Sequence, residues 1–232
     1  MNAPPLLLLV RPEGQSKQLL SECEALFGSS IAAVISPILK INPVGKCPDL
    51  QSYQGVIVTS ANAVRFAGDL HGIRLYCVGN RTRIAAQQAG ADVLFTARDV
   101  DALVVRLRAE MPEGRLMYLR GEHVASDLQK SLDRAGLETD SQVIYCQSPR
   151  PIGVVLGAAI SGDMCAVLPL YSPRSARLLG EGVEGLGAGL HVIAISQTVA
   201  DVWRRETGGE CEICETPDGD EMLGKIVAAL RC

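Results

Sequence analysis

The sequence predicts an α/β protein made of two similar parallel-sheet lobes of flavodoxin-like layout, joined by a two-stranded connector. One observation behind this prediction is that short apolar runs alternate with amphipathic stretches of about ten residues, which is typical of a parallel α/β sheet. The other is that the order of these elements restarts near Arg115. With 232 residues, of which 47% are apolar, the chain is long enough to bury the cores of two small domains.

The first half of the chain opens with a buried strand over residues 6–10 and an amphipathic helix. Ser16 is the expected N-terminal cap of this helix, and Gly28 stands where a helix-ending glycine is common. The apolar side chains between them recur at helical spacing: Leu19, Leu20, Cys23, Leu26 and Phe27. Further strands are expected at 31–35, 56–59, 74–78 and 93–95, and further helices at 61–70, 83–88 and 102–110.

The second half repeats this order. The strand that ends at Arg120 matches the strand that ends at Arg11, and the strand before Ser172 matches the strand before Ser60. The turn 79–82 corresponds in the same way to 196–198. Because the offset between the halves grows smoothly, as loop insertions would make it grow, we infer an internal duplication of units of about 110 residues.

Two extended segments, 37–41 and 142–147, occupy equivalent places in the two halves. Prolines bound the first segment and disfavour helix on their N-terminal side. Side by side, the two segments would form a connector that the chain crosses twice. This assigns residues 1–36 and 148–232 to one lobe and 42–141 to the other. A sequential division near residue 113 is the alternative, but it leaves both extended segments without a role.

Two turns carry the clearest binding signal, because in each an apolar strand stops at a hydroxyl residue and continues into a helix. Ser60 and Ser172 are therefore placed to cap helices, and a helix N-terminus suits an anion.

A second pair of turns follows the next strands, and an arginine ends the first strand of each half. If all four turns face one cleft between the lobes, they surround a large anionic ligand. The candidate binding residues are Arg11, Ser60, Ala61, Asn62, Asn80, Thr82, Arg120, Ser172, Pro173, Ser175, Ser196 and Thr198. Plain helix caps and solvated surface arginines are the alternative interpretation.

Tyr145 lies on the second connector segment and is the candidate catalytic residue. Facing a cleft between lobes, its phenol could donate a proton to a departing oxygen or stabilise it. The alternative is a strand tyrosine that packs on one lobe.

The composition excludes several classes of function. A net charge of −4 argues against an indiscriminate nucleic-acid or membrane binder, and no apolar run approaches the roughly 20 residues of a membrane span. Six of the eight cysteines are scattered singly, which is typical of reduced thiols, so we expect a cytoplasmic protein. Cys211 and Cys214 form one Cys-x-x-Cys pair without the second pair or spaced histidine that a zinc site needs.

In order and spacing, several motifs together resemble the uroporphyrinogen-III synthase family over essentially the whole chain. The motifs are Val10-Arg11-Pro12, Pro37, 58–64, 78–82, 119–121, 143–145, 172–176 and 194–200. The chain departs from the family pattern at Val10 and Tyr171, where threonine is common, and at Ser196, where glycine is common. These departures put individual contacts in doubt.

The resemblance implies two α/β lobes, the first built from both chain ends, and a monomeric lyase of haem biosynthesis that needs no cofactor or metal. Its substrate would be hydroxymethylbilane, a linear tetrapyrrole with eight carboxylates, received in a transient hand-over from the enzyme that makes it. Tyr145 matches the family tyrosine thought to assist loss of the terminal hydroxyl, and Thr82 and Thr198 match hydroxyl positions of the family's turns.

Two other classes of protein remain as rivals. One is a non-catalytic two-lobed binding protein that closes on a small anion, although a signal peptide is not evident. The other is a flavodoxin-like nucleotide enzyme, but the glycine-rich or hydroxyl-rich phosphate loop that it needs is absent after Val10.

Overall fold

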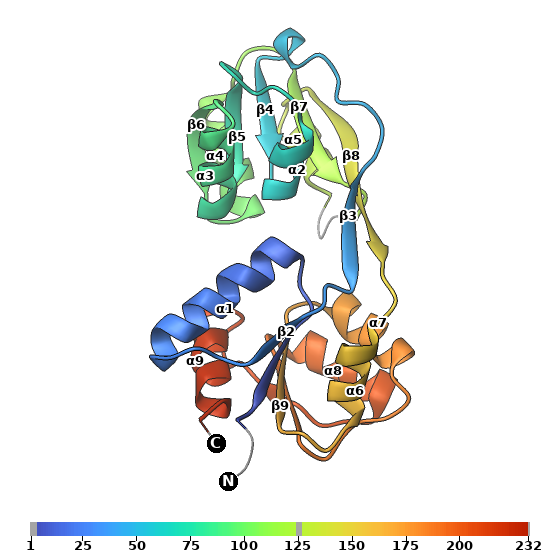
Figure 1. The fold of residues 1–232 in the computed structure, drawn as a ribbon. Helices are drawn as coiled ribbons and strands as arrows, with labels where there is room; N and C mark the ends of the chain where they lie inside the picture. Colours follow the sequence, from blue (N-terminus) through green and yellow to red (C-terminus); the bar gives the residue numbers. More distant parts are fainter. Residues whose placement is uncertain (1–3, 124–126, 232) are drawn as a thin grey trace. The chain divides into compact units, whose positions relative to one another are not determined.

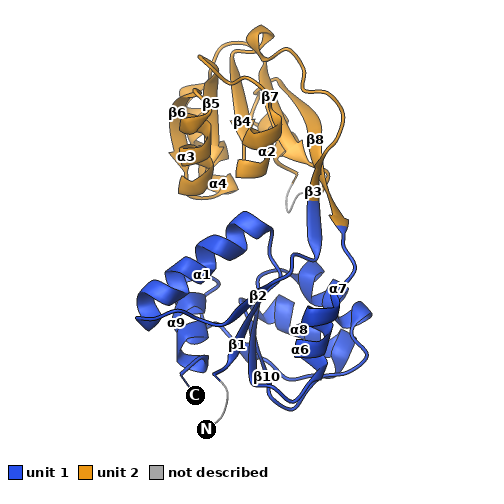
Figure 2. Cartoon of the chain, viewed as in Figure 1, with its two compact units in different colours: residues 1–40, 149–232 blue, residues 41–148 orange. Residues whose placement is uncertain are grey.

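The computed structural model describes residues 4–123 and 127–231, and the chain divides into two compact units. Unit 1 comprises Met1–Lys40 and Pro149–Cys232, and unit 2 comprises Ile41–Ser148 (Figure 2). The units therefore change at residues 40 and 148, and neither ends near residue 113.

Within the described residues, unit 1 contains a five-stranded parallel sheet with the strand order β11-β10-β9-β1-β2. The strands are β1 (Leu6–Leu9), β2 (Ala33–Ile35), β9 (Ala166–Leu170), β10 (Leu190–Ala194) and β11 (Glu212–Ile213). Helices α1 (Glu13–Phe27) and α9 (Gly219–Ala229) cover one face, as Figure 1 shows. Helices α6 (Val154–Ser161), α7 (Pro173–Gly182) and α8 (Gln197–Thr207) cover the other.

Apolar side chains fill the two faces of this sheet because successive residues of a strand point in opposite directions. Leu7 and Leu9 of β1 pack against α1 and α9, whereas Leu8 packs against α6, α7 and α8. Trp203 of α8 is fully buried on the second face. The central strand β1 is thus buried on both sides, as is usual in parallel sheets.

The described part of unit 2 contains a six-stranded sheet with the order β3-β8-β7-β4-β5-β6. The strands are β3 (Leu39–Pro43), β4 (Gly55–Val58), β5 (Arg74–Val78), β6 (Asp92–Ala97), β7 (Leu116–Gly121) and β8 (Thr139–Pro149). Helices α2 (Ala61–Phe66) and α3 (Asn80–Gln88) pack on one face, and α4 (Val100–Glu110) and α5 (Leu128–Arg134) on the other. A short 3₁₀ helix spans Leu50–Ser52.

The two sheets have the same strand order once the sequence correspondence is applied. Unit 1 reads β2-β1-β9-β10-β11, and its counterpart in unit 2 reads β8-β7-β4-β5-β6. If β1, β2, β9, β10 and β11 are numbered 1 to 5, and β7, β8, β4, β5 and β6 likewise, both sheets have the order 2-1-3-4-5. This is the order of flavodoxin-like sheets, in which ligands bind where the order of strands reverses. In unit 1 that point lies between β1 and β9, and in unit 2 it lies between β7 and β4.

The chain passes between the units inside β3 and returns at the end of β8. The two strands are neighbours in the sheet, and the Val44 amide donates to the Ile144 carbonyl at 3.0 Å. Beyond the sheet, the Arg150 amide donates to the Ile38 carbonyl at 2.8 Å. Of the first predicted segment, residues 39–41 lie in β3, and the whole of the second, 142–147, lies in β8.

The predicted role of Ser16 is wrong. Helix α1 begins at Glu13, and Pro12 is its N-terminal cap residue without a side-chain capping bond. Proline suits this place because it has no N–H to satisfy and its φ is fixed. Ser16 therefore lies inside the first turns, fully buried, and its hydroxyl donates to the Arg11 carbonyl at 2.8 Å. Gly28 ends the helix with φ 87°, as predicted.

Other helix limits also differ from the prediction: α4 begins at Val100 instead of residue 102, and two further differences have a cause in a glycine. Helix α3 begins at Asn80 instead of residue 83, because Gly79 takes φ 82° and turns the chain directly into the helix. Helix α2 ends at Phe66 instead of residue 70, because Gly68 takes φ 81°, a left-handed conformation that a helix cannot continue through.

We predict that Ser16→Ala lowers the free energy of unfolding by about 1–2 kcal/mol, because it leaves the Arg11 carbonyl without its buried donor. Urea denaturation of the purified protein measures this loss. Ser21→Ala, on an exposed position of the same helix, is the control and should change stability by less than about 0.5 kcal/mol. Equal effects of the two substitutions would contradict the prediction.

Candidate functional site

Two of the four predicted turns are closed by serine caps, as the sequence indicated. Ser60 precedes α2, and its hydroxyl oxygen accepts the Asn62 amide at 3.2 Å. Ser172 precedes α7, accepts the Ser175 amide at 3.1 Å and donates to the Ser175 hydroxyl at 2.9 Å. Pro173 fills the first helical position, where no N–H is needed. The caps satisfy one amide at each helix start and leave other first-turn amides available to a ligand.

The other two turns differ in that no side-chain capping bond forms at either helix start within the described residues. Gly79 precedes α3, and Ser196 precedes α8. Thr82 is buried in the first turn of α3, whereas Thr198 is exposed in the first turn of α8. Because no side chain occupies their first-turn amides, these helix starts leave more N–H groups unpaired than the two capped starts do.

Asn80 is engaged with its own helix. Its side-chain oxygen accepts two hydrogen bonds from Arg83, at 2.9 Å from Nε and 2.6 Å from Nη2. This contact holds a guanidinium beside the start of α3, which adds positive charge to that end of the helix.

The two strand-end arginines have different surroundings. The guanidinium carbon of Arg11 lies 4.0 Å from the centre of the Tyr171 ring, across the β1–β9 switch point. Burial raises the pKa of Tyr171 to about 12, and the Arg11 cation opposes part of that rise. Arg120 instead donates to the carbonyl of Gly121 at 3.1 Å. Arg11 is thus held by a cation–π contact, and Arg120 by the backbone of its own strand end.

Tyr145 lies on β8, where it pairs with Gly121 of β7. It is 8% exposed, belongs to the α2–α3 core cluster of unit 2, and stacks on Phe66 with ring centres 6.3 Å apart. The ring therefore packs on unit 2, as the alternative interpretation expected. Its role in catalysis stays a prediction.

Within each unit, the candidate residues gather at the carboxyl edge of the sheet. Unit 1 brings Arg11 together with the starts of α7 and α8, and unit 2 brings Arg120 and Tyr145 together with the starts of α2 and α3. Parallel strands place all their carboxyl ends at one edge, so this gathering follows from the fold.

Sequence reasoning missed Tyr118, a neighbour of these residues. The Tyr118 hydroxyl lies 3.3 Å from the Thr59 hydroxyl, so it ties the end of β7 to the residue that precedes Ser60. Burial raises the pKa of Tyr118, which keeps the phenol protonated. A buried tyrosine two residues before a strand-end arginine was the available signal.

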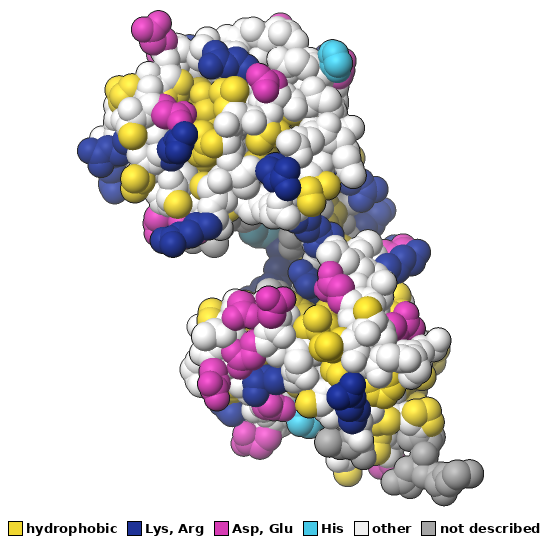
Figure 3. All heavy atoms as spheres, turned by 90° about the vertical axis from the view of Figure 1, so that its left-hand side faces the viewer, with side chains coloured by type: hydrophobic (Ala, Val, Ile, Leu, Met, Phe, Trp, Pro, Cys, Tyr) yellow, Lys and Arg dark blue, Asp and Glu magenta, His cyan; other side chains and the backbone are white. Residues whose placement is uncertain are grey.

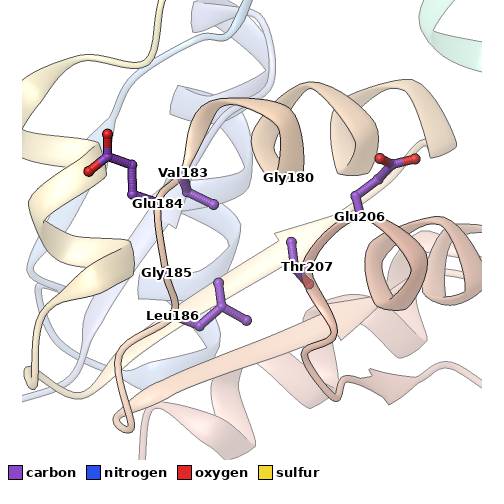
Figure 4. Close-up of a pocket in the computed structure, with 7 residues that line it drawn as sticks. All are labelled: Gly180, Val183, Glu184, Gly185, Leu186, Glu206 and Thr207. Atoms are coloured by element: carbon purple, nitrogen blue, oxygen red, sulfur yellow. The ribbon is translucent and has the colours of Figure 1, made fainter.

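A pocket of about 210 Å³ lies elsewhere in unit 1, near the carboxyl ends of α7 and α8 (Figure 4). None of the predicted site residues lines it. Its lining residues are Gly180, Val183, Glu184, Gly185, Leu186, Glu206 and Thr207.

On the face that Figure 3 shows, basic and acidic side chains are interspersed. Among residues 4–123 and 127–231, no group of three or more His, Cys, Asp or Glu side chains is arranged to hold a metal ion. No helix in the same described ranges is long and apolar enough to cross a membrane. The described cysteines are free thiols, and Cys232 lies outside the described residues.

These features define an α/β protein of two units, each with polar turns at the carboxyl edge of a flavodoxin-like parallel sheet. Residues 22–224 match the family model described as uroporphyrinogen-III synthase HemD, so the chain belongs to the uroporphyrinogen-III synthase family.

Solved structures show the same fold. A uroporphyrinogen-III synthetase from Helicobacter pylori 26695 is similar with a TM-score of 0.68 and 16% identity, over 97% of this chain and 99% of that one. A mutant uroporphyrinogen III synthase from the extremely thermophilic bacterium Thermus thermophilus is similar with a TM-score of 0.51 and 16% identity, over 98% and 99% of the chains. A search of the curated proteins finds no match.

We predict that Ser172→Ala lowers the free energy of unfolding by about 1 kcal/mol, because the α7 cap is lost. Ser196→Ala is the matched variant in the same unit and should cost less than about half as much, because Ser196 makes no capping bond. Urea unfolding followed by far-UV circular dichroism measures both. Equal losses would show that the two helix starts do not differ in this way.

Proposed function

We propose that this chain is a uroporphyrinogen-III synthase, which cyclises hydroxymethylbilane with inversion of the last pyrrole ring and loss of water. The observation that carries the proposal is the family match over residues 22–224. The strand order of both units and the polar turns at their carboxyl edges support it. The enzyme is a cyclising lyase of tetrapyrrole biosynthesis.

The reaction begins when the carbon–oxygen bond to the terminal hydroxyl breaks and the hydroxyl leaves as water, having taken one proton. The resulting azafulvene cation is attacked by the substituted carbon of the last ring, which forms a spiro intermediate. That intermediate fragments and closes again at the other position of the ring, with loss of one proton. Without enzyme the chain closes to the symmetric isomer, so the protein must hold one conformer and direct one bond.

The eight carboxylates of this substrate need many cationic or amide partners. We propose that the starts of α3 and α8 bind them with first-turn amides and with the hydroxyls of Thr82, Ser196 and Thr198. Arg11 and Arg120 add charge-assisted contacts at the strand ends. Further contacts come from the two capped turns and from Asn80: Ser60, Ala61, Asn62, Asn80, Ser172, Pro173 and Ser175.

Tyr145 is the proposed catalytic residue, with its phenol hydrogen-bonded to the departing hydroxyl. The residue is 8% exposed, and we propose that this exposed part is the hydroxyl end of the ring, which would then meet a ligand at the edge of unit 2. A phenol held beside a leaving oxygen stabilises the developing charge without reorganising water.

We further propose that the two units are lobes derived from one duplicated ancestor and that the protein acts as a monomer in the cytoplasm. The matching strand orders support the duplication. The singly scattered cysteines support a reducing compartment. A transient hand-over from the enzyme that makes hydroxymethylbilane would protect this unstable substrate.

A coupled assay tests the function. Porphobilinogen and its deaminase generate hydroxymethylbilane in the presence of the protein, and the oxidised products are separated by isomer. We expect predominantly isomer III, because enzymatic ring inversion must outrun spontaneous closure. Formation of isomer I alone by folded protein would overturn the proposal and favour the two-lobed binding protein.

Tyr145→Phe should lower kcat for isomer III by at least about tenfold with little change in KM, because a transition-state contact is lost. Tyr53→Phe is the matched control. It removes a phenol in the same unit whose hydroxyl donates to Asp140, and it should leave kcat unchanged. If Tyr145→Phe retains the normal rate, Tyr145 has no part in the reaction.

A further inference from the structure

The strand that carries Tyr145 is irregular at that position. Residues 116–120 of β7 pair with residues 139–143 of β8, but Gly121 pairs with Tyr145, so Ile144 is an extra residue in the ladder. Successive strand residues normally point to opposite faces. Here both Ile144 and Tyr145 pack in the α2–α3 core cluster. The bulge therefore places the Tyr145 ring on the same face as Ile144, in the way that bulges redirect side chains.

Gly121 provides the space that the redirected ring fills. A Cβ atom at residue 121 would lie 2.6 Å from Cζ of Tyr145, 2.7 Å from Cε2 and 2.8 Å from the hydroxyl oxygen. At these distances a side chain at 121 would force the Tyr145 ring or the strand to shift. The backbone of Gly121 is not in the left-handed region, so its conformation would accept other residues. Glycine at residue 121 is thus explained by the space that the Tyr145 ring needs, and not by the backbone conformation.

Phe66 is a second neighbour of the Tyr145 ring. Phe66, the last residue of α2, stacks on Tyr145 with ring planes inclined by 28°. The guanidinium carbon of Arg65 lies 5.3 Å from the centre of the Phe66 ring. A side chain at 121 would therefore have to shift a ring that also stacks on Phe66.

We propose that Gly121 is a positioning residue, which sets the place of the Tyr145 hydroxyl at the carboxyl edge of unit 2. The inference rests on the proposed role of Tyr145 in the synthase reaction. A methyl group at residue 121 would contact Cζ and the hydroxyl oxygen at the end of the Tyr145 ring. It would therefore displace the hydroxyl, which is the group proposed to meet the leaving oxygen. Near-attack geometry tolerates little displacement of that kind.

The first experiment compares Gly121→Ala with Gly55→Ala in the coupled assay. Gly55 begins β4 of the same sheet, and a Cβ there would lie 2.6 Å from Cε2 of Tyr76, a buried tyrosine with no proposed part in the reaction. Both substitutions press a methyl group on a tyrosine ring and should lower stability. Only Gly121→Ala should lower kcat for isomer III, by at least about tenfold, with KM changed by less than about twofold.

A double-mutant cycle separates positioning from a general loss of structure. If Gly121 acts through the phenol, Gly121→Ala in the Tyr145→Phe background should change kcat by less than about twofold. An equal fold-loss in both backgrounds would overturn the proposal, as would a normal kcat for Gly121→Ala. A normal kcat for Tyr145→Phe, with isomer III still formed by the unsubstituted protein, would overturn it while leaving the synthase function in place.

Phe66→Leu is the second variant, in case Gly121→Ala fails to fold. It removes the stacked ring without introducing a clash, so it should fold and lower kcat several-fold (about three- to tenfold) only when Tyr145 is present. A crystal structure of Gly121→Ala, combined with Phe66→Leu if the single variant does not fold, reports the ring position independently of activity. A Tyr145 ring in its original place would overturn the proposal even if the protein proved to make isomer I alone.

Discussion

The parallel pairing of β1 with β9 and of β4 with β7 is the constraint on which the rest of the structure depends. Parallel neighbours need crossover helices, and each crossover starts a helix at the carboxyl edge of its sheet. Polar turns, strand-end arginines and unsatisfied amides are therefore concentrated at one edge of each unit. A polyanionic ligand can be bound there without a basic surface, which accords with a net charge of −4.

The features that sequence reasoning predicted correctly are local ones. Ser60 and Ser172 cap helices because a hydroxyl residue between a strand and a helix has few other uses, and Gly28 ends its helix for an equally local reason. The error at Ser16 is also local: Pro12 can begin a helix without a cap, and the pattern of apolar residues does not show where the first turn starts.

The surroundings of Tyr145 could not be predicted, because they depend on the pairing of strands distant in sequence. The residue type and its place on an extended segment were visible, but the bulge at Ile144 emerges only once β7 and β8 are aligned. In the same way, the Arg11–Tyr171 contact joins residues that meet only because β1 lies beside β9. Such contacts determine whether a side chain is held, and single-sequence patterns carry little information about them.

The division of the chain into units has a consequence for biosynthesis. Unit 2 is one continuous stretch, Ile41–Ser148, whereas unit 1 needs both Met1–Lys40 and Pro149–Cys232. During translation, β1 emerges early, but its neighbour β9 is made only after all of unit 2. Unit 2 therefore has the opportunity to fold on the ribosome while the apolar strand Leu6–Leu9 still lacks one side of its sheet. The order in which the ribosome delivers the strands therefore leaves β1 without its neighbour β9 until the second half of the chain has been made.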